Sequence, residues 1–195
     1  MAQVRMQKTN TLADNHYVLK EVHFELQKKD GSWAPQKRKV FDHGNAAAVL
    51  LYNQQEGTII LTRQFRLATY LNGNPSGMLL EACAGLLEEN EEPEKTILRE
   101  IEEETGYQLS EVQKVFEAYS SAGALTEKIF LYVAPYRKDQ RVSSGGGLQE
   151  EGEDIEVVEL SFEEVLQQLD NGAIMDAKTI ILLQYARIKG LLQKQ

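Results

Sequence analysis

Residues 85–107, GLLEENEEPEKTILREIEEETGY, carry the strongest structural signal in this sequence. Pro93 followed by Glu94 predicts the start of a helix, because proline suits the first turn and a carboxylate suits its positive end. Gly106 predicts the end of that helix in a left-handed conformation. Three apolar residues spaced three and four apart would give the helix one face to bury. They are Ile97, Leu98 and Ile101.

The same stretch is strongly acidic, with nine glutamates from Glu88 to Glu104. Glu100, Glu103 and Glu104 fall on one helix face, where like charges repel by roughly 0.2–0.5 kcal/mol per pair. A divalent cation would reverse this repulsion, and carboxylate oxygens select hard ions such as magnesium or manganese. The alternative is a solvated face, which is the usual role of a run of charges.

The spacing of the fixed residues favours a metal site over a solvated face. The order is a glycine, five residues, a glutamate, seven residues, Arg-Glu, an apolar residue, one residue, Glu-Glu, one residue, a glycine and an apolar residue. This pattern resembles the Nudix box, and all seven of its fixed positions match. They are Gly85, Glu91, Arg99, Glu100, Glu103, Glu104 and Gly106. The resemblance implies an α+β fold, the Nudix α/β/α sandwich with a mixed sheet between helices.

Five segments resemble the GDP-mannose pyrophosphatase branch of the Nudix hydrolases, close to the ADP-ribose pyrophosphatases. They are FDHGNAAAVLLY (41–52), TRQFRLATYLNG (62–73), LLEACAGLLEE (79–89), GGGLQEEGEDIEV (145–157) and DAKTIILLQY (176–185). The resemblance implies metal-dependent hydrolysis of the pyrophosphate bond of a nucleoside diphosphate sugar. GDP-mannose would give GMP and mannose 1-phosphate, and ADP-ribose or another ADP-sugar is the alternative substrate. It also implies a homodimer whose N-terminal β-element reaches across to the partner.

Pyrophosphate resists attack by water because its oxygens are negative, and metal ions neutralise that charge and lower the pKa of a bound water. The ions would be magnesium or manganese. The ligands that the resemblance implies are Ala84 (through its carbonyl), Glu100, Glu104 and Glu153. Gly85 would let the chain turn so that the carbonyl of Ala84 faces the ions.

The resemblance also implies the residues that support the chemistry. Glu103 would assist the metal site, and Arg99 would hold a box glutamate in position. Glu151 falls at the position of the general base, on an acidic loop that residues 145–147 are expected to make a mobile arm. A shift of register in this loop would exchange the roles of Glu151 and Glu153.

Eight residues match substrate positions of the branch: His16, Tyr17, Lys37, Arg38, Lys39, Arg66, Glu127 and Lys178. Arg66 would bind phosphate, and its alternative is a surface salt bridge. The basic cluster at 37–39 would contact the neighbouring subunit's substrate, and its alternative is a solvated edge strand. The ring that meets the nucleobase would come from His16 or Tyr17, and the register between them stays open.

Composition sets limits on the class of protein. A chain of 195 residues, 42% hydrophobic and 26% charged, is expected to be globular with a sizeable core. The net charge of −9 argues against nucleic acid as a partner. The single Cys83 excludes an internal disulfide and favours a small buried residue in a reducing compartment. No signal peptide or spanning segment is visible, so no membrane partner and a cytoplasmic location are expected.

Residues 1–43 are predicted to form an antiparallel β-element for dimerisation, swapped between subunits, and residues 44–195 the Nudix domain. Residues 1–13 are polar and expected to be poorly tied down. Alternation and turn signals predict strands. Their ranges are 17–27, 33–41, 46–52, 58–65, 78–82, 112–119, 128–136 and 155–160. Ser161 with Glu164 predicts a capped helix to Asn171, and Asp176 would cap a last helix to about Leu192.

Two functions from other classes are the alternatives to hydrolysis. A Nudix-fold module that binds a nucleotide without turnover would be expected to lose box glutamates, and none is lost here. A structural calcium-binding protein would need spaced Asp and Gly residues of the EF-hand kind, which the sequence lacks. Hydrolysis therefore remains the favoured function.

Overall fold

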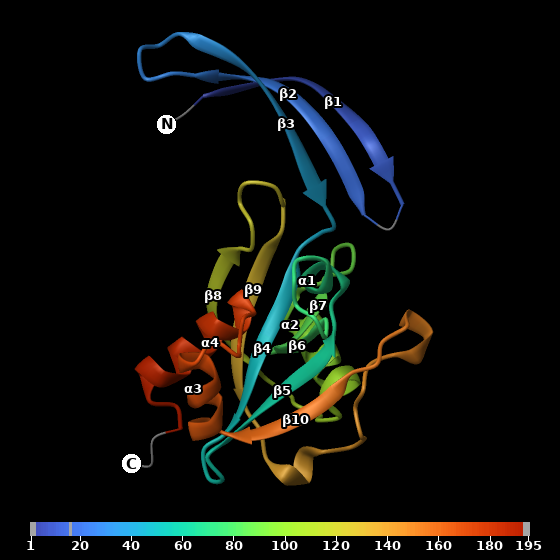
Figure 1. Cartoon of the computed structure of the whole chain (residues 1–195), viewed down its shortest axis with the longest axis vertical. Coiled ribbons are helices and arrows are strands. Elements are labelled where there is room, and N and C mark those ends of the chain that lie inside the picture. The colour runs from blue at the N-terminus through green and yellow to red at the C-terminus, as the bar shows by residue number, and fades with distance from the viewer. Residues whose placement is uncertain (1–2, 16, 193–195) are drawn as a thin grey trace. The chain divides into compact units, whose positions relative to one another are not determined.

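The computed structural model describes residues 3–15 and 17–192. They fall into two compact units (Figure 1). One unit comprises Met1–Asn45 with Tyr119–Lys128, and the other comprises Ala46–Ala118 with Ile129–Gln195. Residues 119–128, which the predicted division assigns to the second domain, therefore cluster with the N-terminal strands.

The first unit is built on a three-stranded antiparallel sheet in the order β1-β2-β3. Its strands are β1 (Val4–Asp14), β2 (Val18–Gln27) and β3 (Trp33–Asp42). The expectation that residues 1–13 are poorly tied down is wrong, because Val4 pairs with Leu26 and Asp14 with Val18. Val4 and Met6 alternate, and the threonines that follow favour extended backbone. The ladder therefore forms although nearly all side chains of β1 are exposed.

The segment Tyr119–Lys128 joins the first unit through the end of β3. The Phe41 N–H donates to the Ala124 carbonyl at 2.8 Å, and the Thr126 N–H donates to the Phe41 carbonyl at 3.1 Å. The Thr126 hydroxyl also donates to Asp42 Oδ1 at 2.8 Å. These bonds fix the position of Glu127, the next residue along the chain.

The second unit contains a seven-stranded mixed sheet. The path runs β10-β5-β4-β9-β8, with β6 added to β5 and β7 added to β4. The strands are β4 (Ala46–Asn53), β5 (Thr58–Phe65), β6 (Met78–Glu81), β7 (Cys83–Leu86), β8 (Gln113–Tyr119), β9 (Lys128–Pro135) and β10 (Glu156–Ser161). β4 runs parallel to β9 and antiparallel to β5 and β7. Its almost continuous apolar sequence follows from its central place in the sheet.

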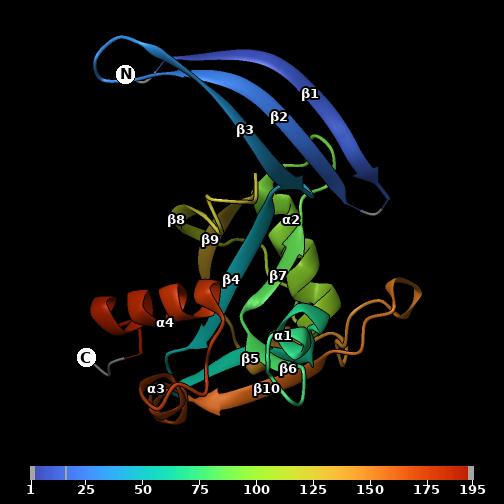
Figure 2. The same cartoon turned by 45° about the horizontal axis from the view of Figure 1, so that its top comes forward.

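Helices cover both faces of this sheet (Figure 2). They are α2 (Pro93–Glu100), α3 (Phe162–Asp170) and α4 (Ala177–Lys189). The short α1 (Leu67–Leu71) follows β5 and has no buried residue. Alternate residues of β4 point to opposite faces, so Leu50 packs in the core beneath α3 and α4, and Leu51 packs in the core beneath α2. The α/β/α sandwich that the sequence predicted is confirmed. In the described part of the chain no helix is long and apolar enough to cross a membrane.

The predicted helix signals are confirmed. Pro93 begins α2, and Gly106 ends the helical segment with a left-handed φ of 76°. The Ser161 hydroxyl accepts the Glu164 N–H at 3.2 Å, and Asp176 accepts the Thr179 N–H at 2.9 Å. The short helix α1 and a change of helix type were not predicted. After Glu100 the α-helix continues as a π-helix, Ile101–Thr105, and π-turns of this kind are frequent at functional sites.

Candidate active site

Arg99 forms ion pairs with three glutamates of the box. Its Nη1 lies 2.9 Å from Glu100 Oε1 and 2.8 Å from Glu103 Oε2, and its Nη2 lies 3.5 Å from Glu91 Oε2. One guanidinium thus fixes carboxylates from the loop before the helix, the end of α2 and the π-helix. This geometry is compatible with the positioning role predicted for Arg99, since the planar fork of arginine matches carboxylates well.

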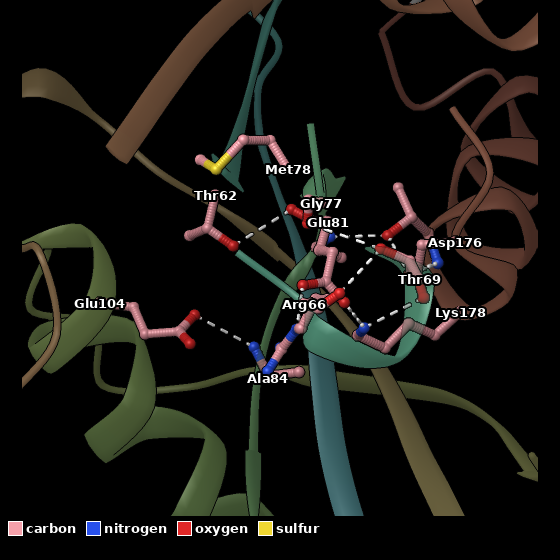
Figure 3. A network of polar contacts seen from close by, with 12 residues as sticks. Thr62, Arg66, Thr69, Gly77, Met78, Glu81, Ala84, Glu104, Asp176 and Lys178 are labelled. Carbon is pink, nitrogen blue, oxygen red and sulfur yellow. Dashed lines mark hydrogen bonds and ion pairs between the residues drawn. The ribbon is translucent and has the colours of Figure 1, made fainter. Parts of the chain in front are cut away.

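Glu104 is the most deeply buried acid of the box, with 1% of its surface exposed. Its Oε2 accepts the Ala84 N–H at 3.2 Å (Figure 3), and the Cys83 thiol also bonds its carboxylate. Burial raises the pKa of Glu104 to about 8, and the nearby Glu100 adds to the rise. Burial likewise raises the pKa of Glu100 to about 7, although Arg99 opposes the change. Two carboxylates therefore lie where negative charge is poorly solvated.

Gly85 makes room for Glu100. A Cβ at residue 85 would lie 2.0 Å from Glu100 Oε1 and 2.1 Å from its Cδ. The backbone of Gly85 is ordinary strand, paired with Ala47 of β4, and its φ is not positive. The expected reason for this glycine, a special turn, is therefore wrong, and close approach of a carboxylate replaces it.

Gly85→Ala is expected to lower turnover by about tenfold or more, because the new methyl displaces the Glu100 carboxylate from the group that Arg99 holds. Steady-state kinetics with melting curves would measure the effect. Gly123→Ala is the matched control, since a Cβ there meets nothing within 4 Å. Full activity in Gly85→Ala would show that the position of Glu100 is unimportant.

The glycine-rich segment 145–147 packs on the end of the box helix. The Gly146 N–H donates to the Glu104 carbonyl at 2.9 Å, and the Gly147 N–H donates to the Glu103 carbonyl at 3.1 Å. These carbonyls have no partner within an ordinary helix end, so the loop satisfies them. In this structure the segment therefore packs against the box, and the mobile arm predicted for these glycines stays a prediction.

Glu153 lies close to the carboxylates of Glu100 and Glu104. Its charge contributes to the raised pKa of both Glu100 and Glu104. Its carboxylate accepts the Leu148 N–H at 2.9 Å, and a Cβ at Gly147 would lie 2.4 Å from its Oε2. Glu151 ends the 3-10 turn Gln149–Glu151, and the placement of its side chain falls outside the described part of the structure.

This group of residues fits a hard divalent cation. Its donors are oxygens, with Glu100, Glu104 and Glu153 supplying carboxylates that interact with one another electrostatically. The space that Gly85 leaves lets one carboxylate reach the strand that carries the Ala84 carbonyl. Among the described residues, no three His, Cys, Asp or Glu side chains already surround one point.

Arg66 and Lys178, predicted from distant parts of the sequence, meet at Glu81 (Figure 3). Arg66 Nε donates to Glu81 Oε2 at 2.7 Å, and Lys178 Nζ donates to Glu81 Oε1 at 2.6 Å. Burial lowers the pKa of Lys178, but the carboxylates of Glu81 and Asp176 outweigh it, so the pKa is raised. Glu81 was not predicted. The available signal was a lone carboxylate in the apolar run LLEACAG, since a buried charge requires a partner.

The remaining predicted substrate residues lie in the first unit. The Tyr17 ring lies 5.4 Å from that of Phe41 and 5.1 Å from that of His43. His43 Nε2 is in turn 3.9 Å from Glu127 Oε1, so the structure brings Tyr17 and Glu127 to the same aromatic cluster. His16 lies outside the described residues.

The basic cluster of β3 is exposed. Lys37 Nζ lies 3.0 Å from Glu21 Oε2 on β2, and Arg38 Nη1 donates to the Lys37 carbonyl at 2.8 Å. Lys39 is also exposed. Both the substrate contact and the solvated edge strand remain compatible with this arrangement, because β3 is an edge of its sheet.

Two proteins named GDP-mannose pyrophosphatase match this chain over almost its full length. GDP-mannose pyrophosphatase of Cronobacter sakazakii (strain ATCC BAA-894) is 47% identical over 189 residues, covering 97% of each chain. GDP-mannose pyrophosphatase of Escherichia coli O1:K1 / APEC is 46% identical over 190 residues, covering 97% of this chain and 98% of that protein. A crystal structure of an ADP compounds hydrolase superposes with a TM-score of 0.71 at 17% identity. It covers 97% of this chain and 96% of that chain, and it shows the fold alone.

Two family models match adjacent parts of the sequence. Residues 3–41 match the GDP-mannose pyrophosphatase NudK N-terminal domain. Residues 42–183 match the NUDIX domain, which contains the complete box, the sandwich and the acidic group at the end of α2. The chain is therefore a member of the NUDIX domain family of pyrophosphatases.

Proposed function

We propose that the protein hydrolyses the pyrophosphate bond of GDP-mannose, giving GMP and mannose 1-phosphate, with magnesium or manganese as the metal. The observation that carries this proposal is the identity of 46–47% over nearly the whole chain to proteins named GDP-mannose pyrophosphatase. The complete box supports turnover rather than mere binding, because every glutamate that the chemistry uses is present. ADP-ribose or another ADP-sugar remains the alternative substrate.

Different residues of the site have different roles in this reaction. Glu100, Glu104, Glu153 and the Ala84 carbonyl would hold the metal. When bound, the metal neutralises phosphate charge and lowers the pKa of water. Arg99 keeps the box carboxylates in place through the three contacts described above. Glu151 would take the proton from the attacking water, since carboxylates occupied with metal are poor bases.

Arg66 and Lys178 would bind the diphosphate. Arg66 is 41% exposed, and within the described residues its two Nη atoms bond no side chain, which leaves the fork of the guanidinium for a phosphate. Lys178 carries a second positive charge on the other side of Glu81. Tyr17 and Glu127 in the first unit would contact the nucleotide, and Lys37, Arg38 and Lys39 are assigned to the partner's substrate.

A turnover screen tests the substrate. With magnesium present, GDP-mannose is expected to give the highest kcat/KM among GDP-mannose, ADP-ribose, ADP-glucose and NADH. Manganese in place of magnesium would show which ion supports the faster rate. Preference for ADP-ribose by tenfold, about 1.4 kcal/mol, would overturn the ranking.

We further propose a cytoplasmic homodimer, with no nucleic acid or membrane partner, in which residues 1–43 exchange between subunits. The strand β1 supports this proposal because apolar side chains are exposed along it: Val4, Met6 and Leu12. Such a surface is commonly covered in an assembly. Sedimentation at micromolar concentration is expected to show a dimer, and Met6→Lys should weaken it. A fully active monomer would remove this proposal.

A further inference from the structure

Glu81 joins two cations that come from different elements. It is the last residue of β6, and its side chain is 4% exposed. One carboxylate oxygen accepts Arg66 Nε at 2.7 Å, and the other accepts Lys178 Nζ at 2.6 Å (Figure 3). Arg66 precedes α1, and Lys178 lies in the first turn of α4. A single buried carboxylate therefore determines the separation of the two positive groups.

This network is more than the neutralisation of a buried charge. One cation would balance the charge of Glu81, yet Glu81 pairs with two cations. Lys178 also pairs with a second acid, since its Nζ lies 3.2 Å from Asp176 Oδ1. Lys178 is 13% exposed, whereas Arg66 is 41% exposed. Glu81 holds Arg66 through Nε alone, so the outer edge of the guanidinium keeps its donors for a ligand.

The same segment leads directly to the strand of the metal site. The Ala82 N–H donates to Thr179 Oγ1 at 2.7 Å, and Thr179 also donates to Asp176. Two residues further on, the Ala84 N–H donates to Glu104 Oε2 at 3.2 Å. Residues 81–84 thus connect the two cations with the box, because Glu81 bonds Arg66 and Lys178 and Ala84 bonds Glu104.

We propose that Glu81 is a positioning residue, which sets Arg66 and Lys178 as a two-cation grip on the diphosphate of the substrate. This inference rests on the proposed function for the identity of the ligand. Glu81 does not touch the substrate itself. Its carboxylate orients the guanidinium and keeps the Lys178 ammonium charged and in place, so that a phosphate meets both cations without prior rearrangement.

Glu81→Gln tests the grip with little change of shape. The amide keeps one oxygen as an acceptor. Its NH2 group replaces the other oxygen and points donors, instead of an acceptor, at one of the two cations. The expected result is a KM for GDP-mannose raised about tenfold or more, with kcat changed less than about threefold. Glu156→Gln is the matched control, because Glu156 also pairs with an arginine, Arg63 of β5, at 2.8 Å, but on the exposed surface. An unchanged KM in Glu81→Gln would overturn the proposal.

A double-mutant cycle separates positioning from general stability. If Glu81 acts through Arg66, Glu81→Gln should raise KM by a clearly smaller factor in an Arg66→Ala background than in the wild type. Equal factors in both backgrounds would contradict positioning of Arg66. If Glu81→Gln does not fold, Glu81→Asp keeps the charge on a shorter side chain. That variant is expected to show the same rise in KM, and a wild-type KM would overturn the proposal.

Binding of inorganic pyrophosphate distinguishes failure of this inference from failure of the proposed function. If the wild type does not hydrolyse GDP-mannose, the proposed function is wrong, but calorimetry with pyrophosphate and magnesium still tests the grip. The wild type and Glu156→Gln should bind pyrophosphate equally, and Glu81→Gln about tenfold more weakly. Equal affinity in all three proteins, or no binding by the wild type, would overturn the inference.

Discussion

Glu104→Gln is expected to lower the turnover of GDP-mannose by at least about 100-fold while the protein remains folded. Glu104 is the least exposed carboxylate of the box, and it accepts the N–H of Ala84 on β7. Glutamine has the same shape and can still accept the Ala84 N–H, but it lacks the charge that binds a metal. The loss should therefore fall on metal-dependent chemistry rather than on folding.

Melting curves at several pH values make this prediction specific. The folded pKa of Glu104, about 8, is raised above its ordinary value of 4.5. The stability that its proton contributes is present below pH 4.5 and is lost as pH rises through about 8. Without metal, Glu104→Gln should accordingly be at least as stable as the wild type near pH 8. Magnesium at a hundredfold excess over its Kd should stabilise the wild type by about 2.7 kcal/mol and the variant much less.

Glu102→Gln is the matched control for Glu104→Gln. Glu102 belongs to the same π-helix but is exposed, and it accepts a bond from Gln108 Nε2 at 3.3 Å. We expect wild-type turnover and wild-type stabilisation by magnesium in this variant. Ordinary activity of Glu104→Gln at limiting magnesium would contradict the assignment of Glu104 as a ligand.

The second large effect is expected at the general base. Glu151→Gln should lower kcat by about 100-fold or more, the scale of general-base catalysis, because an amide cannot take the proton from water. Its affinity for magnesium should change little. Glu150→Gln, in the same turn Gln149–Glu151, is the control and should keep its rate. The measurement is kcat as a function of pH, in which the acidic limb should disappear only in Glu151→Gln.

Glu153→Gln tells the two loop acids apart. Glu153 interacts with Glu100 and Glu104 and accepts the Leu148 N–H, so its neutralisation should weaken magnesium binding as well as turnover. Should Glu151→Gln keep its rate while Glu153→Gln loses turnover without losing metal, the two roles are exchanged.

Local signals predicted much of the fold because they act over a few residues. Gly106, Ser161 and Asp176 each end or cap a helix through bonds within one turn, and the structure shows all three. The π-helix after Glu100 was not predictable in this way, since it depends on how the helix end packs on the glycines that follow residue 144. The strand β1 was not predicted, because backbone pairing with β2 holds it while nearly all its side chains stay exposed. Its sequence therefore lacks a clear apolar pattern.

The candidate site was predicted where a motif fixes the spacing and missed where only the fold brings residues together. The box placed Arg99, Glu100 and Glu104 on one helical segment. Glu81 has its partners 15 residues earlier and 97 residues later, so no local pattern connects them. The requirement for a glycine at residue 85 likewise depends on the fold, because only the folded chain brings the Glu100 carboxylate next to Gly85.

Phosphorus NMR of the wild-type reaction with GDP-mannose and magnesium tests the central claim most directly. Hydrolysis of the pyrophosphate bond predicts that both diphosphate signals disappear together and are replaced by two phosphomonoester signals, those of GMP and mannose 1-phosphate. Addition of a chelator should stop the change. A spectrum that keeps a diphosphate as GDP beside free mannose, or that stays unchanged with magnesium or manganese present, would contradict the account.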